Sequence, residues 1–244
     1  MNTARDRLYL CLDQGGHASR AIVIDGQGNI HAQAFQAIET QRHDDRVEHS
    51  PQQIITTLEK AAEEAVASLG AAADGIVAAG FATQRSSIVC WHRESGQALS
   101  PVISWQDTRA ADWLHNFQQY EPEIHRVTGL MLSAHYGVSK LRWCIDHIPE
   151  VQRAYGSDQL VFGPLASFIV NQMIGTSPLL ADPANASRTL LWDRHVRDWS
   201  IALAELFTIP VDCLPLCVPS RYHWGELAIA GRMIPVRVVT GDQS

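Results

Sequence analysis

The sequence predicts an α/β domain built on a mixed sheet, with an antiparallel meander and flanking helices. Apolar runs at residues 8–12 and 21–24 surround a glycine-containing turn at residues 14–17, which is typical of a β-hairpin. A third apolar run follows at residues 30–35. A helical pattern then leads to another apolar run at residues 76–81, which indicates a parallel crossover. The hairpin runs lack polar alternation, so we expect both faces of this part of the sheet to be covered.

Length, composition and charge limit the class of protein. The chain has 244 residues, 46% hydrophobic and 18% charged, which fits one large globular domain or two small ones. Its net charge of -7 argues against a nucleic-acid surface and an anionic membrane. No uncharged apolar run reaches the ~18 residues of a membrane span. The apolar stretch at the start of the chain is too short for the core of a signal peptide. Five scattered cysteines indicate free thiols of a cytoplasmic protein.

The helix that follows the meander is predicted from residues that typically begin and end helices. Ser50 suits the N-cap, Pro51 suits the first helical position, and Gln53 would complete a capping box. Apolar residues at helical spacing between residues 54 and 69 form one face, and Gly70 ends the helix.

The rest of the chain alternates short elements with loops. Asp107 and Asp198 each precede a helical pattern, so we expect each to cap a helix. The apolar run at residues 236–240 is expected to be a buried strand. The other expected elements are a surface loop at 39–49, a hairpin of 88–91 with 102–105, helices within 110–117, 136–147, 164–173 and 201–207, a strand at 160–162, and a loop at 210–219.

Three of the buried strands are expected to end in polar side chains. Asp13 and Asp242 each stand where a strand meets a glycine turn, and Arg85 follows a third strand. Open α/β sheets hold ligands at such ends. One carboxylate beside free backbone N–H groups would suit Mg²⁺ and phosphate, and the other could accept a proton from an attacking hydroxyl, as phosphoryl transfer requires. Two alternatives stay open: Asp13 caps an ordinary hairpin, and Asp242 belongs to a frayed tail.

A set of motifs resembles one family when taken in order. Leu12-Asp13-Gln14-Gly15 with Ser19-Arg20 resembles the start of the phosphate loop in the FGGY carbohydrate kinases. Any one motif is weak, but the ordered set is specific and covers nearly the whole chain. The further matches are Val47-Glu48-His49-Ser50-Pro51, Thr83-Gln84-Arg85, Trp105-Gln106-Asp107-Thr108-Arg109, Thr128-Gly129-Leu130, Ser139-Lys140, Asn185-Ala186-Ser187-Arg188-Thr189 and Gly241-Asp242-Gln243.

The resemblance implies a ribonuclease-H-like, actin-like ATPase fold and ATP-dependent phosphorylation of a sugar or polyol hydroxyl. Members of this family are about twice this long and have two such domains. Residues 1–244 would therefore be the N-terminal sugar-binding domain, without the C-terminal nucleotide-binding domain, and inactive when isolated. The expected partners are a small sugar or polyol and ATP with Mg²⁺, with no nucleic acid and no membrane; a homodimer is left open.

The resemblance also assigns roles to individual residues. Asp242 would be the general base, and Asp13 would be the partner of Mg²⁺. The expected substrate pocket consists of Arg85, Ser86, Trp105, His135 and Asp242, and the expected cofactor site of Asp13, Gln14, Gly15, Gly16, His17 and Arg20.

Two departures from the family pattern modify these expectations. Hydroxyl residues that contact ATP phosphates in the glycerol-specific members fall at Gly16, His17 and Ala18, so only backbone N–H groups remain for phosphate. The glutamate and tyrosine that grip glycerol are replaced by Ser86 and His135, so a longer polyol or ketose is expected instead.

Several alternatives remain beside this interpretation. The altered phosphate loop also suits a non-catalytic sugar-binding or regulatory relative of the kinases. A structural or interaction domain would bind no polyol at all. At the level of residues, His135 could simply start a helix, and Trp105 could be part of the core.

Overall fold

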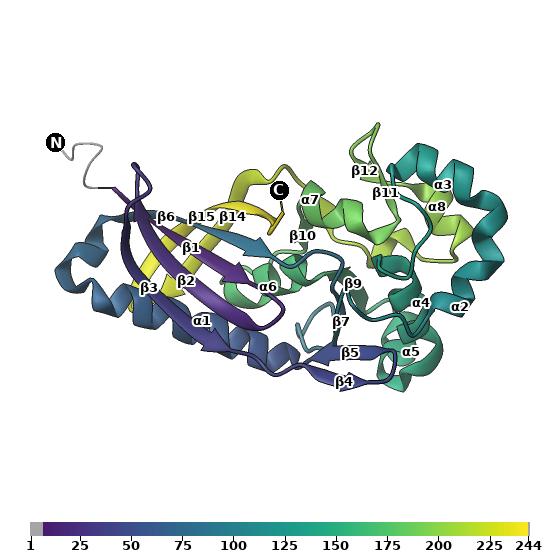
Figure 1. Cartoon of the computed structure of the whole chain (residues 1–244), viewed down its shortest axis with the longest axis horizontal. Helices are drawn as coiled ribbons and strands as arrows, with labels where there is room; N and C mark the ends of the chain where they lie inside the picture. Colours follow the sequence, from purple (N-terminus) through teal and green to yellow (C-terminus); the bar gives the residue numbers. More distant parts are fainter. Residues whose placement is uncertain (1–6, 244) are drawn as a thin grey trace.

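The centre of the protein is a six-stranded mixed sheet, seen in a computed structural model that describes residues 7–243 (Figure 1). The strand order is β14-β15-β6-β1-β2-β3. β15, β6 and β1 are parallel neighbours, whereas β2, β3 and β14 run antiparallel to the strands they pair with. This confirms the predicted meander and the parallel crossover. The strands are β1 (Leu8–Gln14), β2 (Ala18–Asp25), β3 (Ile30–Ala37), β6 (Ile76–Thr83), β14 (Arg221–Ile229) and β15 (Arg232–Gly241).

One face of this sheet is covered by helices α1 (Pro51–Ser68) and α6 (Leu165–Met173). Leu10, Leu12 and Val23 point into this layer and are fully buried in one core with the apolar face of α1. The other face carries side chains such as Cys11, Ile22 and Val238, which residues 7–243 leave only partly covered. The expectation that both faces are covered is therefore wrong for the described chain, because apolar residues on both sides of a strand do not show what covers them.

A second, five-stranded antiparallel sheet continues from the first sheet and has the order β4-β5-β8-β7-β9. Its first two strands occupy the segment that was expected to be a surface loop, so that prediction is wrong. Val47 is buried there, and its backbone N–H donates to Asp107 Oδ2 at 2.7 Å. The strands are β4 (Gln41–His43), β5 (Arg46–His49), β7 (Ile88–His92), β8 (Val102–Ile103) and β9 (Leu160–Pro164).

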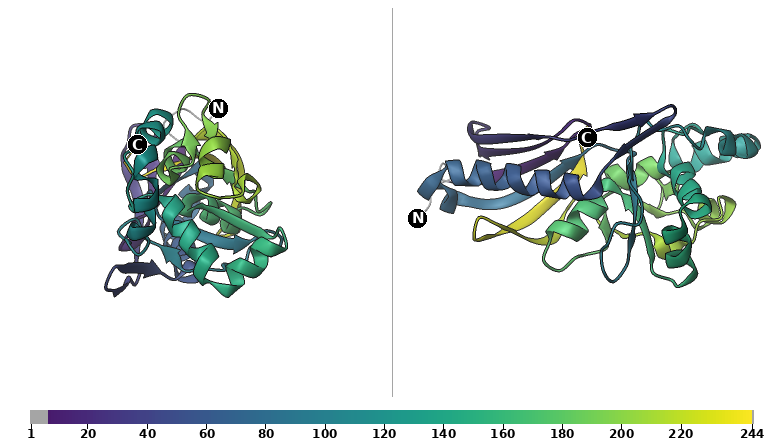
Figure 2. Two further views of the ribbon diagram at one scale, coloured as in Figure 1. Left: turned by 90° about the vertical axis from the view of Figure 1, so that its right-hand side faces the viewer. Right: turned by 90° about the horizontal axis from the view of Figure 1, so that it is seen from below.

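A cluster of short helices packs against the second sheet and forms a second core, at the end of the elongated molecule opposite the large sheet (Figures 1 and 2). The helices are α2 (Ala111–Leu114), α3 (Glu121–Thr128), α4 (Gly137–His147), α5 (Pro149–Gly156), α7 (Pro183–Ala186) and α8 (Ile201–Leu206), with 3₁₀ turns η3 (His115–Tyr120), η4 (Ser187–Thr189) and η5 (Val211–Cys213). A further 3₁₀ turn, η2 (Gly70–Gly75), follows α1 and packs on β6 of the large sheet. Two short strand pairs complete the fold: β10 (Leu180–Ala181) with β13 (Leu216–Cys217), and β11 (Trp192–Asp193) with β12 (Asp198–Trp199).

The start of α1 confirms half of the predicted capping box. The Ser50 hydroxyl accepts from the backbone N–H of Gln53 at 3.3 Å, as expected for an N-cap. The Gln53 side chain accepts from the backbone N–H of Glu39 at 3.0 Å instead of returning to Ser50. The helix is thereby tied to the segment that precedes it.

The other two predicted caps are wrong. Asp107 is fully buried and binds Arg109 and the N–H of Val47, while α2 begins after Ala110. Asp198 lies in β12, and α8 is capped by Ser200, whose hydroxyl accepts from the N–H of Leu203 at 3.3 Å. Asp107 is therefore bound to other partners, and Asp198 ends a strand two residues before the actual cap.

The five cysteines are all free thiols, at positions 11, 90, 144, 213 and 217. Within residues 7–243, no helix is both long enough and apolar enough to cross a membrane.

Candidate active site

The site lies where three parallel strands end at the same edge of the large sheet. Gly241, Thr83 and Gln14 occupy neighbouring register positions at the ends of β15, β6 and β1. Two backbone hydrogen bonds keep the chains side by side just beyond the strand ends. The N–H of Asp242 donates to Thr83 O at 2.9 Å, and the N–H of Gln84 donates to Gln14 O at 2.8 Å. The three strand ends that sequence patterns singled out therefore converge.

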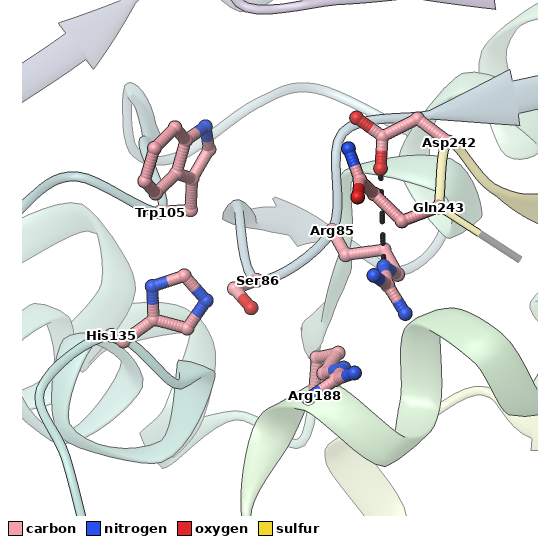
Figure 3. Close-up of a pocket in the computed structure, with 7 residues that line it drawn as sticks. All are labelled: Arg85, Ser86, Trp105, His135, Arg188, Asp242 and Gln243. Carbon is pink, nitrogen blue, oxygen red and sulfur yellow. Dashed lines mark ion pairs between the residues drawn. The ribbon is translucent and has the colours of Figure 1, made fainter.

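A pocket of about 280 Å³ opens beside this edge (Figure 3). Its volume lies near the lower end of the ~300–1,000 Å³ usual for ligand sites, so it suits a small molecule. The structure brings together all five residues that were expected to form the substrate pocket and adds two that were not expected. The lining residues are Arg85, Ser86, Trp105, His135, Arg188, Asp242 and Gln243.

Arg85 and Asp242 face each other in a loose ion pair on one wall of the pocket. Arg85 Nε lies 3.8 Å from Asp242 Oδ1, and both side chains are partly exposed. The aliphatic part of Arg85 crosses directly over Gly241, where a Cβ atom would overlap Arg85 Cγ and Cδ. Glycine at position 241 therefore allows the guanidinium to reach the neighbouring carboxylate.

The surroundings of Asp242 make its carboxylate more basic than usual. Partial burial raises the pKa of Asp242, the nearby charge of Asp13 raises it further, and the charge of Arg85 acts in the opposite direction. Asp13 is thus close enough to act on Asp242 electrostatically, although the two residues lie on different strands.

Ser86 and His135 are held in place by one buried lysine. The ammonium of Lys140, which is 1% exposed, donates to Ser86 O at 3.1 Å and to His135 O at 2.7 Å. Ser86 has a left-handed backbone with φ 65°, which is strained for a residue other than glycine. Its hydroxyl is buried and has no hydrogen-bond partner in the described chain, so a ligand in the pocket could bind it.

Trp105 and His135 form the wall opposite Asp242. The two rings meet edge to face, with their centroids 5.6 Å apart. Trp105 is 38% exposed, which is more consistent with a ligand-facing ring than with a core residue. Burial, together with the charges of Lys140, Arg188 and Arg85, lowers the pKa of His135, so its imidazole is neutral at pH 7. This wall offers an aromatic edge and a neutral donor or acceptor.

Arg188 reaches the pocket from the turn that follows α7. Asp182 caps α7, and its carboxylate accepts from the Asn185 side chain at 2.8 Å. The Thr83 hydroxyl donates to Asn185 Oδ1 at 3.2 Å, which ties this turn to the end of β6. The motif around Asn185 could be recognised in the sequence, but not the partner that brings Arg188 to the pocket.

The expected cofactor loop is the turn between β1 and β2. Asp13 Oδ2 accepts from Arg20 Nη1 at 2.7 Å. Gln14 is buried, and its side chain supports the turn by accepting from Ser19 and donating to Gly15 O. The loop is therefore shaped by Gln14 and Ser19 and carries Asp13 and Arg20 as a charge pair.

The tip of this loop is suited to an anion. Within residues 7–243 the backbone N–H groups of Gly16 and His17 donate to no acceptor, and His17 is exposed. Free N–H groups at a turn can bind phosphate oxygens without any hydroxyl side chain. Mg²⁺ often uses only one or two carboxylates and retains several waters, so the free Oδ1 atom of Asp13 fits such an ion. Within this loop, Asp13 is the residue that could hold Mg²⁺, and the backbone at Gly16 and His17 is the part that could hold phosphate.

Residues 8–244 match the family model described as "FGGY family of carbohydrate kinases, N-terminal domain". Glycerol kinase from Paracidovorax citrulli is 36% identical over an aligned length of 239 positions, and the alignment covers 96% of this chain and 47% of that protein. Glycerol kinase from Burkholderia vietnamiensis is 35% identical over an aligned length of 246 positions, gaps included, and the alignment covers 98% of this chain and 49% of that protein.

Solved structures show the same fold. Glycerol kinase from Plasmodium falciparum, crystallised with ADP, superimposes with a TM-score of 0.90 at 24% identity and covers 97% of this chain and 49% of its own. Xylulose kinase from Rhodospirillum rubrum gives a TM-score of 0.87 at 19% identity, with 97% and 49% covered.

The fold is accordingly that of the actin-like ATPases, a ribonuclease-H-like α/β domain with a mixed sheet. The chain belongs to the FGGY family of carbohydrate kinases, and the part it matches is the N-terminal domain. It spans about half the length of the curated relatives that it matches.

Proposed function

We propose that this chain is the substrate-binding half of an ATP-dependent kinase that phosphorylates a hydroxyl of a sugar or polyol. The observation that carries the proposal is the convergence of Asp13, Arg85 and Asp242 at one sheet edge, beside a small pocket. Phosphoryl transfer needs positioning, charge neutralisation and one proton acceptor, and these three residues supply suitable groups.

Asp242 would act as the general base. A substrate hydroxyl within hydrogen-bond distance of its carboxylate would lose its proton to Asp242 as the oxygen attacks the phosphoryl group. The raised pKa of Asp242 favours this proton transfer, and Arg85 keeps the carboxylate oriented. The rest of the substrate would lie along Trp105 and His135, with Ser86 and Gln243 available to its hydroxyl groups.

Asp13 and the β1–β2 turn would hold the phosphate end of the site. Asp13 would face Mg²⁺, and the N–H groups of Gly16 and His17 would bind phosphate oxygens. When bound, ATP with Mg²⁺ supplies the phosphoryl group and neutralises part of its charge. Gln14, Gly15 and Arg20 would support the loop around this position.

The division of labour between domains is part of the proposal. Residues 1–244 would form the N-terminal sugar-binding domain, and a C-terminal domain outside this chain would contribute most of the nucleotide site. The match to an N-terminal family domain and the coverage of about half of each relative support this division.

We also propose that the substrate is longer than glycerol. Ser86 and His135 leave Asp242 as the sole acid among the lining residues. Ser86 and His135 are also smaller than the glutamate and tyrosine that they replace, which would leave more space for additional carbons. A pentulose, hexulose or pentitol could place one hydroxyl at Asp242 and others at Arg85 and His135.

The test is ADP release by the full-length protein that contains this chain, with ATP, Mg²⁺ and a panel of polyols, ketoses and aldoses. Turnover that depends on one of these substrates supports the proposal. Saturable binding of a polyol without ADP release from any substrate would instead favour a non-catalytic sugar-binding relative, the alternative suggested by the hydroxyl-free tip of the β1–β2 turn. Absence of both binding and turnover would favour an interaction domain.

A further inference from the structure

Gln84 is a buried side chain whose carboxamide makes no hydrogen bond. The residue follows β6 directly and is 2% exposed, and neither its Oε1 nor its Nε2 atom has a partner within residues 7–243. Buried amides are normally paired, because an unpaired one loses its bonds to water without replacing them. An exception at the edge where the site lies indicates that the amide serves a ligand.

A second glutamine at the neighbouring strand end shows how a purely structural amide is bound. Gln14 is 1% exposed, accepts from the Ser19 hydroxyl at 2.7 Å and donates to Gly15 O at 2.9 Å. The two glutamines are direct neighbours, since the backbone N–H of Gln84 donates to Gln14 O at 2.8 Å. Gln14 therefore supports the β1–β2 turn from within, whereas the amide of Gln84 takes no part in that support.

The amide of Gln84 lies between the β1–β2 turn and the substrate pocket. A Cβ atom built on Gly16 would lie 3.5 Å from Gln84 Oε1, and no other heavy atom of the described chain, apart from the residues next to Gly16, would be within 4 Å. Arg85 and Ser86, which follow at once, line the pocket. Because no bond fixes the carboxamide, it can present either Oε1 or Nε2 to the space beside Gly16.

The tip of the turn is held loosely enough to admit a ligand to this amide. Both amide atoms are closed to solvent in the described chain, so the tip has to shift slightly before a ligand can reach them. The Gly16 carbonyl accepts from the Thr40 hydroxyl at 3.3 Å, which is long for a bond between two oxygens. A small rotation of this peptide would release that bond.

We propose that the Gln84 carboxamide donates a hydrogen bond to an oxygen of the phosphoryl group that is transferred. The inference rests on the proposed function and adds a catalytic residue to it. A phosphoryl group that passes to a hydroxyl at Asp242 must lie between the turn and the pocket, and Gln84 stands at this boundary. Negative charge is spread over the oxygens of this group during transfer, so a donor aimed at one of them stabilises the transition state.

The first test needs no nucleotide. Gln84→Met replaces the unpaired amide by an apolar side chain of similar length, so the melting temperature of the chain should stay unchanged or rise by about 2–4 °C. Gln14→Met is the matched comparison, because it removes an amide that makes two hydrogen bonds, and it should lower the melting temperature. An equal decrease for both variants would show that Gln84 is bonded within the fold, directly or through an internal water, and would overturn the proposal.

The second test measures nucleotide binding to the full-length protein with Mg²⁺ and without turnover. Calorimetric titration compares ADP with the imido analogue of ATP, which keeps the terminal phosphate but is not cleaved. Gln84→Met should weaken binding of the analogue about 10- to 100-fold, because a hydrogen bond to a charged group is lost, and should leave ADP binding nearly unchanged. Gln27→Met, which alters an exposed turn, is the control and should leave both affinities unchanged.

The results that would overturn the proposal differ in what they leave standing. Unchanged affinity of Gln84→Met for the ATP analogue would remove Gln84 from the site and leave the proposed function intact. Equal losses for ADP and the analogue would assign Gln84 to the shape of the turn instead of the terminal phosphate. If the unaltered full-length protein binds neither nucleotide, the proposed function fails as well.

Discussion

Replacing Gly241 by alanine tests the geometry on which the site depends. The added Cβ atom would overlap Cγ and Cδ of Arg85, and this part of the side chain cannot retreat without moving the guanidinium. Overpacking of this kind costs about 1–3 kcal/mol. For a domain of this size, each kcal/mol lowers the melting temperature by roughly 2–4 °C, so we expect a decrease of about 2–12 °C.

The chain offers a matched control in Gly156→Ala. No heavy atom lies within 4 Å of a Cβ atom built at Gly156, the last residue of α5. This substitution should leave the melting temperature unchanged or raise it slightly, because alanine restricts the unfolded chain more than glycine does. Calorimetry or circular dichroism of the two variants gives the comparison.

A double variant shows whether the overlap with Arg85 is the cause. Arg85→Ala removes the atoms that the new Cβ atom would meet, so it should cost much less in the Gly241→Ala background than in the original chain. If Gly241→Ala melts at the same temperature as Gly156→Ala, the close approach of Arg85 to Gly241 is refuted. Strict additivity of the two substitutions would refute it as well.

Three further predictions concern charge, domain organisation and specificity. Burial lowers the pKa of Lys140 from 10.5 to about 7. Between pH 7 and pH 10.5 the unfolded chain therefore binds more protons than the native chain, so this group makes the free energy of unfolding rise with pH in that range. Urea titrations between pH 7 and 9.5 should show a rise for the unaltered chain that Lys140→Met lacks; equal slopes would contradict the buried charge. Residues 1–244 alone should release no appreciable ADP, and turnover near the typical ~10 s⁻¹ would exclude the two-domain proposal. In the full-length protein, kcat/KM should be higher for substrates of about five carbons or more than for glycerol. Ser86→Glu should shift this preference back toward glycerol. If glycerol gives the highest kcat/KM in the unaltered protein, the inference that Ser86 excludes glycerol as the best substrate is refuted.

The large sheet could be predicted because its strands carry a local signal. Continuous apolar runs around the turn at Gly15 and Gly16 predicted the meander, and the capped helix predicted the crossover. β14 was not predicted, because it lies at the sheet edge and buries only Trp224, Leu227 and Ile229, which gives no continuous apolar run. The polar hairpin β4–β5 was missed for a similar reason: its pairing with β8 and Asp107 lies far along the chain.

The site could be predicted as far as strand ends and family motifs allowed. Asp13 lies at the end of β1, and Arg85 and Asp242 follow β6 and β15; the parallel order of these strands places the three residues at one edge. The roles of Lys140 and Arg188 depend on contacts that no local pattern shows. Lys140 binds the Ser86 carbonyl across 54 residues of sequence, and the turn of Arg188 is fixed by a Thr83–Asn185 bond across 102 residues.

The most direct measurement of the central claim is the effect of Asp242→Asn on the full-length protein. Asparagine keeps the size of the side chain but cannot accept the proton, so kcat should fall by at least about a hundredfold, the usual low end for a lost general base. Affinity for the substrate should change much less, because the pocket residues remain. A kcat equal to that of the unaltered protein would contradict the account.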